Sequence, residues 1–539
     1  MTGEYSLEKS RNSLPTLKYK DIYIHSKYDP AKEGENLIRD ILWENKKCIV
    51  IYGMGLAYHV EALIRQKHEL KIIIIEKSPE ILSLLKKTNR DKLFHSVRLY
   101  LGDLNGLEPW LFQAIEEYEA DSVLQFQHKV SVSLDPDYYN LAGKIVANCI
   151  KYKLQSYITT LGFSRRWHEN ILKNLRAIDR CHRISKKSDL PVFIIGSGPS
   201  LDQHIKELSS LNNKGLVIAI APVYQRLLDA GVEVHYLITV DGGIANLRHF
   251  LPEDKRHANT VLITTLSACP AAIRLWEGEI LLINQSLSLE KRILEHCPEV
   301  PMRGNVALAA FSVAQHLSDG AIYLIGLDFA FSRGLYHFKG NRLELSLLSS
   351  TGRFKSMETM LYSMIHRFST SVVESFDGER VLTNLAMRSY LEWMEGLVTD
   401  SKRMVQSVDQ YGARLKGVYQ TTIREMIESL KTNKTEFRVK DFQEKLSDSE
   451  IMRIRSSLGK LLEYYRKIYE SLSHRNIKPD DLKKFLAEKG YGELSELISF
   501  SESKLFKKLH SKAFVEDDMT EFINSIRRTI RLSEMAIRL

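Results

Sequence analysis

Short apolar runs alternate with amphipathic helical segments along the first part of the chain. Residues 46–64 pass from an apolar run through a Gly-x-Gly turn into helical spacing, and residues 70–85 repeat that order with Glu76 at the end of the run. Apolar runs this short suit parallel strands that helices bury on both faces. The pattern predicts a Rossmann-like N-terminal domain over residues 1–145.

A second alternation of apolar runs and helical segments begins near residue 190. Residues 145–185 show helical periodicity with polar interruptions, which predicts a connector into this region. Helical segments separate most of the runs, so we expect a mainly parallel sheet in a central α/β domain over residues 146–400. The six predicted strands span 191–196, 215–221, 234–240, 260–265, 279–284 and 321–326.

The last part of the chain contains no further strand candidates. Two segments, 448–475 and 516–539, are rich in charge and carry helical apolar spacing. They predict an all-helical C-terminal domain over residues 401–539, interrupted near Pro479 and Gly490. The expected fold class is therefore α/β, with two α/β domains followed by a helical one.

Composition agrees with a multidomain globular protein. A chain of 539 residues is too long for one hydrophobic core, and three domains are expected. No apolar run is long enough to span a bilayer, and residues 1–20 lack the apolar segment of a signal peptide. Five scattered cysteines favour reduced thiols and no zinc site. We therefore expect a cytoplasmic location and no transmembrane segment.

Positive charge is concentrated in the C-terminal region. The chain has a formal charge of +9, and residues 401–539 contain 28 Lys and Arg against 21 Asp and Glu, a net of +7. Such a region can meet nucleic acid, an anionic surface or an acidic protein partner, or it can form a solvated helical face. Because no motif interleaves aromatic and basic residues, the sequence favours the solvated face and no nucleic acid.

The Gly53-Met54-Gly55 turn follows the first buried run, and an acid, Glu76, comes 21 residues after the second glycine. This spacing is close to a dinucleotide or S-adenosylmethionine fingerprint. The third glycine is missing, however, and Tyr58 and His59 crowd the turn. The sequence favours a packing role for these glycines, with no bound cofactor.

A second glycine-rich turn ends the first strand of the central domain. Its residues are Gly196, Ser197, Gly198, Pro199 and Ser200. Glycine permits a sharp turn, proline suits a first helical turn, and amides at a helix N-terminus attract a phosphate. No Gly-Lys-Ser/Thr follows, so the turn is not a P-loop. A strand-to-helix turn without a ligand explains the same residues.

Further polar groups follow other strands of the predicted sheet. Asp241, Asp328 and His337 come after strand ends, and Gly304-Asn305 precede a helix of small residues. Ligands of open α/β sheets gather outside the carboxyl ends of the strands. A histidine can take a proton from a hydroxyl. The two acids can cap helices, bind loop amides or hold Mg²⁺ between phosphates.

Several motifs together resemble the Maf (motility-associated factor) flagellin glycosyltransferases. The resemblance covers residues 20–400, and the helical tail agrees with the family in architecture. It rests on IHSKYDPAKEGENLI, TLGFSRRWHENILKNL, GSGPSLD, ITVDGG, RGNVALAAFSVAQHL, AIYLIGLDFAF and DGERVLTNLAMRSYLEWM.

The resemblance implies a cytoplasmic enzyme with a central domain similar to bacterial sialyltransferases. Such an enzyme transfers a nonulosonic acid, pseudaminic or legionaminic acid, from its CMP-activated donor to Ser or Thr of flagellin, as flagellum assembly and motility require. No cofactor is expected, and Mg²⁺ is optional. His337 and Asp241 are the expected catalytic residues. The expected nucleotide and donor contacts are Gly196, Ser197, Gly198, Pro199, Ser200, Gly304, Asn305, Asp328 and Thr383.

Three other functions stay open. The central motif also resembles an archaeal hydroxymethylpterin pyrophosphokinase, which uses ATP and Mg²⁺ and would make Asp241 and Asp328 metal ligands. A methyltransferase would bind S-adenosylmethionine at the first glycine turn. A non-catalytic protein that binds flagellin would need no nucleotide.

Overall fold

The computed structural model describes residues 5–537 apart from 44–45, 68–69, 116, 250–258, 301–303, 368–369, 431–437, 475–500, 503, 506–507 and 509–515. The chain divides into two compact units, Met1–Gly162 and Phe163–Leu539, where three domains were expected. Helix α6 (Pro136–Asn174) passes through the boundary, which confirms the predicted helical connector. Each unit is described separately below.

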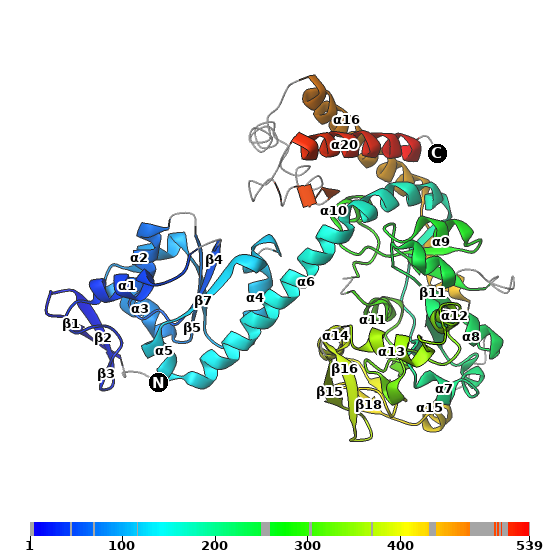
Figure 1. Ribbon diagram of the computed structural model, residues 1–539, viewed down its shortest axis with the longest axis horizontal. Coiled ribbons are helices and arrows are strands. Elements are labelled where there is room, and N and C mark those ends of the chain that lie inside the picture. Colours follow the sequence, from blue (N-terminus) through cyan, green and yellow to red (C-terminus); the bar gives the residue numbers. More distant parts are fainter. Residues whose placement is uncertain are drawn as a thin grey trace. The chain divides into compact units, whose positions relative to one another are not determined.

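The first unit contains a parallel four-stranded sheet in the order β6-β5-β4-β7. Alternate residues of β4 face opposite layers: Ile49 and Ile51 pack with α1, α2 and α3, whereas Val50 and Tyr52 pack with α4 and α6 (Figure 1). Burial on both faces explains the continuous apolar runs of the sequence. The strands are β4 (Cys48–Tyr52), β5 (Lys71–Glu76), β6 (Arg98–Leu101) and β7 (Val123–Gln127), and the helices are α1 (Pro30–Arg39), α2 (Tyr58–Gln66), α3 (Pro79–Lys87) and α4 (Leu107–Ala114).

A small antiparallel sheet precedes helix α1. Its strands are β1 (Tyr5–Lys9), β2 (Pro15–Tyr19) and β3 (Ile22–Tyr23). The side chain of Asp29 then caps α1 by accepting a hydrogen bond from the amide of Lys32, and Pro30 occupies the first helical turn. This entry therefore uses two ordinary helix-start signals.

The second unit is built on a ten-stranded sheet in the order β18-β17-β14-β9-β10-β11-β12-β13-β8-β19. The pairings are parallel except that of β19 with β8. Strand order runs one way from β9 to β13 and the other way from β14, so the topological switch point lies between β9 and β14. The strands are β8 (Cys181–Ile184), β9 (Val192–Ile195), β10 (Leu216–Ile220), β11 (Tyr236–Ile238), β12 (Val261–Thr264), β13 (Ile280–Leu282), β14 (Ile322–Ile325), β17 (Val405–Ser407), β18 (Tyr419–Gln420) and β19 (Gln443–Lys445).

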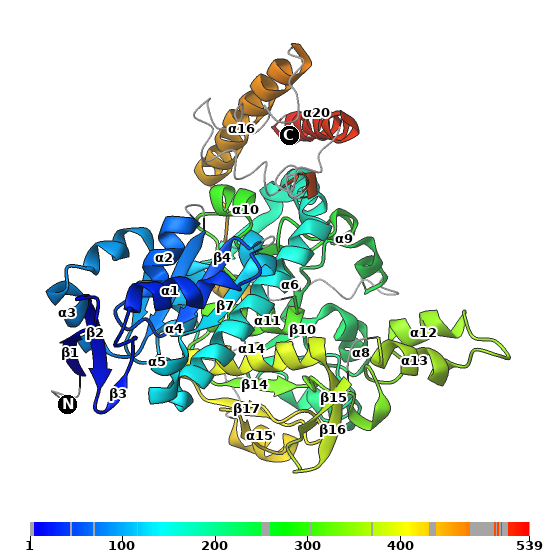
Figure 2. The ribbon, with the colours of Figure 1, turned by 60° about the vertical axis from the view of Figure 1, so that its left-hand side comes forward.

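Helices cover the middle of this sheet. The six predicted strands are confirmed as β9 to β14, and every residue of each is buried. Helix α11 (Val306–Leu317) contacts β9 and β10, and α14 (Leu385–Ser401) lies beside α11 (Figure 2). Since α11 leads into the parallel strand β14, its N-terminus lies at the carboxyl edge of the sheet.

The prediction that strands end near residue 400 is wrong. Strands β17 and β18 extend the central sheet on one side, and β19 pairs with β8 on the other. These strands are two or three residues long, and Gln443–Lys445 is polar, so no apolar run marked them. The C-terminal helices are confirmed: α16 (Asp448–His474) packs against α20 (Glu516–Ile537). The interruption expected near Pro479 and Gly490 lies outside the described residues.

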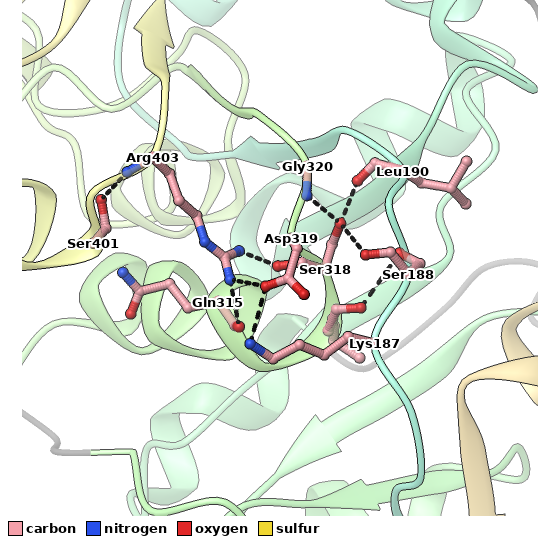
Figure 3. A network of polar contacts seen from close by, with 10 residues as sticks. Lys187, Ser188, Leu190, Gln315, Ser318, Asp319, Gly320, Ser401 and Arg403 are labelled. Carbon is pink, nitrogen blue, oxygen red and sulfur yellow. Dashed lines mark hydrogen bonds and ion pairs between the residues drawn. The ribbon is translucent and has the colours of Figure 1, made fainter.

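A polar network fastens the amino edge of the central sheet (Figure 3). The Arg403 guanidinium donates to the carbonyls of Gln315 and Ser318, which end α11, and pairs with Asp319 at 2.6 Å. Asp319 also pairs with Lys187 at 3.1 Å. The arginine therefore satisfies helix-end carbonyls that would otherwise lack a partner, and it joins three connections of the sheet.

Within the part of the chain that the structure describes, no helix combines the length and apolar character that a membrane span requires.

Candidate functional site

The glycine turn after β9 lies at the topological switch point, against the loop that follows β14. The amide of Gly196 donates to Ile325 O at 2.7 Å, and the amide of Gly198 donates to Gly326 O at 2.8 Å. A Cβ on Gly196 would lie 2.5 Å from Gly326 O, and one on Gly198 would overlap the carboxylate of Asp328. Glycine is therefore required here because two backbone segments approach closely.

The turn differs from the open phosphate cradle that the sequence predicted. The amide of Ser200 donates to the carboxylate of Asp328, so the amides of Gly196, Gly198 and Ser200 are all engaged within the protein. The expected helix is one short turn, α7 (Leu201–His204). A four-residue helix supplies little dipole, and the turn is primarily a packing element.

Two buried acids, Asp328 and Asp409, contact Ser200 of this turn. The Ser200 hydroxyl lies 2.7 Å from Asp328 Oδ2 and 2.8 Å from Asp409 Oδ1. Asp328 Oδ1 lies 2.7 Å from the hydroxyl of Ser332, which is also 2.8 Å from the carbonyl of Tyr411. Both carboxyl side chains are almost completely buried. Asp409 follows β17 and was not predicted from the sequence.

The two buried acids share hydrogens with two serines. The serine hydroxyls supply two hydrogens for four short oxygen–oxygen contacts, which favours a carboxyl proton in one of the remaining contacts. Burial raises the pKa of both carboxyls, and the neighbouring Asp409 helps to raise that of Asp328 to about 7. Asp409 accepts the amides of Gly326 and Leu327 at 2.8 and 2.9 Å, which stabilises its ionised form. We therefore assign the proton of the pair to Asp328.

Asp328 does not fit the metal-ligand role considered for it. Its oxygens already contact Ser200 and Ser332. Asp241, the other candidate ligand, is exposed and accepts the amide of Gly243 at 2.8 Å. Among the described residues, no group of three or more acidic, histidine or cysteine side chains gathers in a metal-binding arrangement. The two acids therefore do not form a shared Mg²⁺ site.

His337 contacts Ser197 of the glycine turn. Its Nδ1 is 3.1 Å from the Ser197 hydroxyl and 3.2 Å from the Ser197 carbonyl, and the amide of Phe338 donates to that carbonyl at 3.1 Å. Burial lowers the pKa of His337 to about 4, because a charged ring is poorly solvated there. The imidazole is therefore neutral at pH 7, the form that can accept a proton.

Charged residues act on His249, which follows Arg248 in the chain. Burial, followed by the charges of Arg248, His337 and Arg342, lowers the pKa of His249 to about 4. We call Arg248, His249, His337 and Arg342 the basic cluster. Arg367 acts on the neighbouring Tyr336 in the same way, by lowering its pKa against the effect of burial. Both histidines are neutral at pH 7, so the positive charge here comes from the arginines, and this charge attracts an anionic ligand.

The N-terminus of α11 reaches the same region. Asn305 caps the helix by accepting the amide of Ala307 at 2.7 Å, and Gly304 has a φ of +76°. A Cβ on Gly304 would lie 3.7 Å from the hydroxyl of Tyr390, and the pKa of Tyr390 is raised by burial and by nearby Tyr336. Gly304 therefore lies beside Tyr390 of α14, and the grouping of Gly304 and Asn305 with the His337 loop stays a prediction. Arg303 of the same motif lies outside the described residues.

Asp241 and Thr383 are placed by contacts with other parts of the unit. Gly242, next to Asp241, packs against Trp167 and Asn170 of α6. Thr383 is fully buried in β16 (Arg380–Asn384), and its hydroxyl donates to Phe329 O at 2.9 Å. Thr383 thus braces the loop after β14.

Sequence reasoning missed several residues of the site. Asp409 follows the short alternating segment 404–408, which was excluded by placing the domain boundary at residue 400. Arg342 begins helix α12 (Arg342–Leu348) and His249 ends the short helix Ile244–His249; neither was singled out, although the density of basic residues in 333–342 indicated positive charge after β14. Tyr390 was not singled out within its motif.

Side chains of the same unit occupy the space beside the first glycine turn. A Cβ on Gly55 would overlap His25 Nε2, which accepts the amide of Leu56 at 2.7 Å. Glu76, the acid of the fingerprint spacing, accepts the amide of Met54 at 2.9 Å. Both contacts engage the turn within the protein, which agrees with a packing role for its glycines.

Residues 165–334 match the family described as 6-hydroxymethylpterin diphosphokinase MptE-like. Over nearly its whole length the chain is also similar to a solved structure, the MAf glycosyltransferase from Magnetospirillum magneticum AMB-1. The TM-score is 0.60 at 12% sequence identity, covering 99% of this chain and 92% of that chain. The Maf-like fold implied by the sequence motifs is therefore confirmed. Among curated proteins, no sequence matches this chain.

Proposed function

We propose that this protein is a glycosyltransferase that moves a nonulosonic acid from its CMP-activated donor to Ser or Thr of flagellin in the cytoplasm. The observation that supports it best is the similarity to a MAf glycosyltransferase across 99% of the chain, outer regions included. Those regions have no purpose in a kinase that acts on a small pterin, whereas a protein acceptor needs a large contact surface.

The basic cluster suits this donor. A CMP-nonulosonate carries a phosphate and a sugar carboxylate, and the leaving CMP gains negative charge as the glycosidic bond breaks. Cationic side chains fixed in place stabilise such developing charge without reorganisation. The capped N-terminus of α11, beside Tyr390, adds a positive helix end on the same side of the sheet. The donor would bind over the His337 loop, above the closed glycine turn.

His337 is the proposed base. Its Nδ1 can donate to the Ser197 carbonyl, 3.2 Å away, which leaves Nε2 unprotonated and able to accept the proton of the acceptor hydroxyl. A pKa of about 4 makes the ring a weak base. It would therefore take the proton late, when bond formation to an oxocarbenium-like sugar has acidified the hydroxyl.

His337→Gln tests this role directly. We expect kcat for sugar transfer to fall about a hundredfold, the range of one general base, with CMP affinity and the melting temperature retained. Single-turnover transfer and calorimetry measure these quantities. Transfer at the wild-type rate would remove His337 as the base.

The second candidate is an ATP-dependent pyrophosphokinase, supported by the family match over residues 165–334. That reaction needs Mg²⁺ between phosphates, and the engaged carboxyl of Asp328 offers no free ligand for it. The closed amides of the glycine turn also provide no cradle for a triphosphate. Both observations favour the transferase.

Calorimetric titration of the full chain distinguishes the candidates. CMP should bind without metal, and Arg342→Gln should weaken that binding about tenfold, whereas Arg424→Gln, at an exposed arginine of α15 (Ile423–Ser429), should not change it. Binding of ATP only with Mg²⁺ would favour the kinase. A chain that binds flagellin but neither nucleotide would be a non-catalytic partner protein.

A further inference from the structure

A second recess lies within the unit Phe163–Leu539 and contains none of the residues discussed so far as donor contacts. It is a cavity of about 320 Å³ between the end of α6 with the following turn Leu175–Arg180, helix α9 (Pro270–Leu275) and helix α20. Apolar side chains from α9 and α20, among them Ile273, Leu532 and Met535, form part of its lining. We call it the α6–α9–α20 groove.

Four basic side chains line the groove: Lys173, Arg176, Arg180 and Arg274. Lys173 pairs with Glu169 at 3.1 Å. The guanidinium of Arg180 donates to backbone carbonyls of α9 and the residue after it, which keep its position but do not neutralise its charge. Within the described ranges, no carboxylate pairs with Arg176, Arg180 or Arg274. The groove therefore presents three uncompensated positive charges.

The walls of the groove are tied together. Arg528 of α20 pairs with Glu169 of α6 at 3.1 Å, so that one carboxylate binds cations from both helices. A second pair joins Arg165 to Glu521 at 2.8 Å. Because α20 is fixed to α6 at two points, the cavity between them is a property of the folded unit.

We propose that the α6–α9–α20 groove binds an acidic segment of the protein acceptor, with one apolar side chain in the cavity and carboxylates on the rim. The inference rests on the proposed function, which makes a protein the acceptor. Charge complementarity selects an acidic partner, and the apolar lining and modest volume suit a single Leu- or Phe-sized side chain. The lining contains no aromatic ring on which a nucleobase could stack, which argues against nucleic acid.

Recognition at this groove would be separate from the chemistry at the switch point. Lys173 and Arg176 lie at the end of α6 and Arg274 on α9, whereas His337 follows β14. A segment bound here would raise the local concentration of acceptor hydroxyls without touching the donor. Acceptor affinity and donor affinity should then respond to different substitutions.

The experiment measures binding of purified monomeric flagellin to the full chain by calorimetry. The double variant Arg176→Glu/Arg274→Glu should raise the Kd at least tenfold, and added salt should weaken wild-type binding. Arg424→Glu, another exposed arginine of the same unit, is the matched control and should leave the Kd unchanged. Both variants should keep the wild-type melting temperature and CMP affinity.

An unchanged Kd in the double variant overturns the proposal, and so does a wild-type chain that does not bind flagellin. The proposed function fails in a different way: the wild type would bind flagellin through the groove but would neither bind CMP nor transfer a sugar.

Discussion

Two glycine turns in this protein have similar sequences, but different kinds of side chain pack against them. Each follows the first buried strand of an α/β sheet, at 53–55 in the first unit and at 196–198 in the second, and each is closed by the protein's own side chains. His25 packs against the first turn, with the ring of His128 5.2 Å from that of His25, whereas the carboxyl group of Asp328 packs against the second. A Gly-x-Gly spacing thus reports close packing at a strand end, and the surrounding side chains decide whether a ligand can bind nearby.

The backbone also separates the two turns. Gly53 and Gly55 have φ values of +74° and +51°, whereas Gly196 and Gly198 have negative φ. The first pair is required by conformation and contact together, and the second by contact alone. His337, a member of the basic cluster, contacts the second turn through Ser197.

The largest effect is expected from adding a methyl group to the second turn. In Gly198→Ala the new Cβ would overlap Asp328, which cannot move because it is buried and hydrogen-bonded. The free energy of unfolding should fall by about 3 kcal/mol or more. Gly459→Ala, where no neighbour lies within 4 Å, is the control and should not destabilise the protein. Urea unfolding followed by circular dichroism measures both, and equal stabilities would contradict the close contact.

An intermediate effect should separate the two buried acids. Asp409→Asn places an amide NH₂ against at least one of the Gly326 and Leu327 amides and should cost about 2–3 kcal/mol. Asp328→Asn replaces a protonated carboxyl by another group that donates and accepts, so its cost should stay below about 1 kcal/mol. The same unfolding measurement ranks them. The reverse order would place the proton on Asp409.

The smallest expected effect is the pH dependence of the free energy of unfolding, to which the two turns should contribute with opposite signs. The ordinary pKa of a histidine is 6.5. Burial lowers the pKa of His25 below this value, and it lowers the pKa of His128 to about 3. The unfolded chain therefore binds protons first, and stability is lost as pH falls below about 6.5. Asp328 has a folded pKa of about 7 against an ordinary 3.8, so its contribution is lost as pH rises from about 4 through 7. Glu76 in the first turn, whose pKa burial raises, opposes its histidines in part.

Two variants show which residue causes each part of the pH dependence of stability. His128→Gln should flatten the loss of stability between pH 6.5 and 5, and Asp328→Asn should flatten the loss between pH 5 and 7. Unfolding free energies from urea titrations at half-unit steps of pH give the two slopes. A variant that changes the part assigned to the other turn would contradict the comparison.

The sequence predicted the elements with strong local signals. Six central strands were predicted correctly because runs such as 191–196 and 321–326 are apolar throughout, as strands buried on both faces must be. The three short strands beyond residue 400 could not be found in this way, since sheet position, and not composition, makes Gln443–Lys445 a strand. The convergence of Gly304 with the His337 loop was predicted from strand order alone.

Side-chain roles were harder to predict than positions. Asp328 was expected to face a ligand, yet its partner Asp409 comes from a segment 81 residues later, and that contact turns both carboxyls inward. Nothing local to Asp328 reveals this pairing. The same holds for the effect of Arg342, which begins helix α12, on His249.

The two edges of the central sheet have a consequence for biosynthesis. A single stretch, 405–445, supplies β17 and β18 at one edge and β19 at the other, whereas the sheet of the first unit is complete at residue 127. During translation the first sheet can therefore fold early, while the central one keeps exposed edges until residue 445 has left the ribosome. Such edges invite association with other chains. Nascent chains stalled at residue 400 should accordingly be protease-sensitive in the central sheet, and chains released beyond 445 should not.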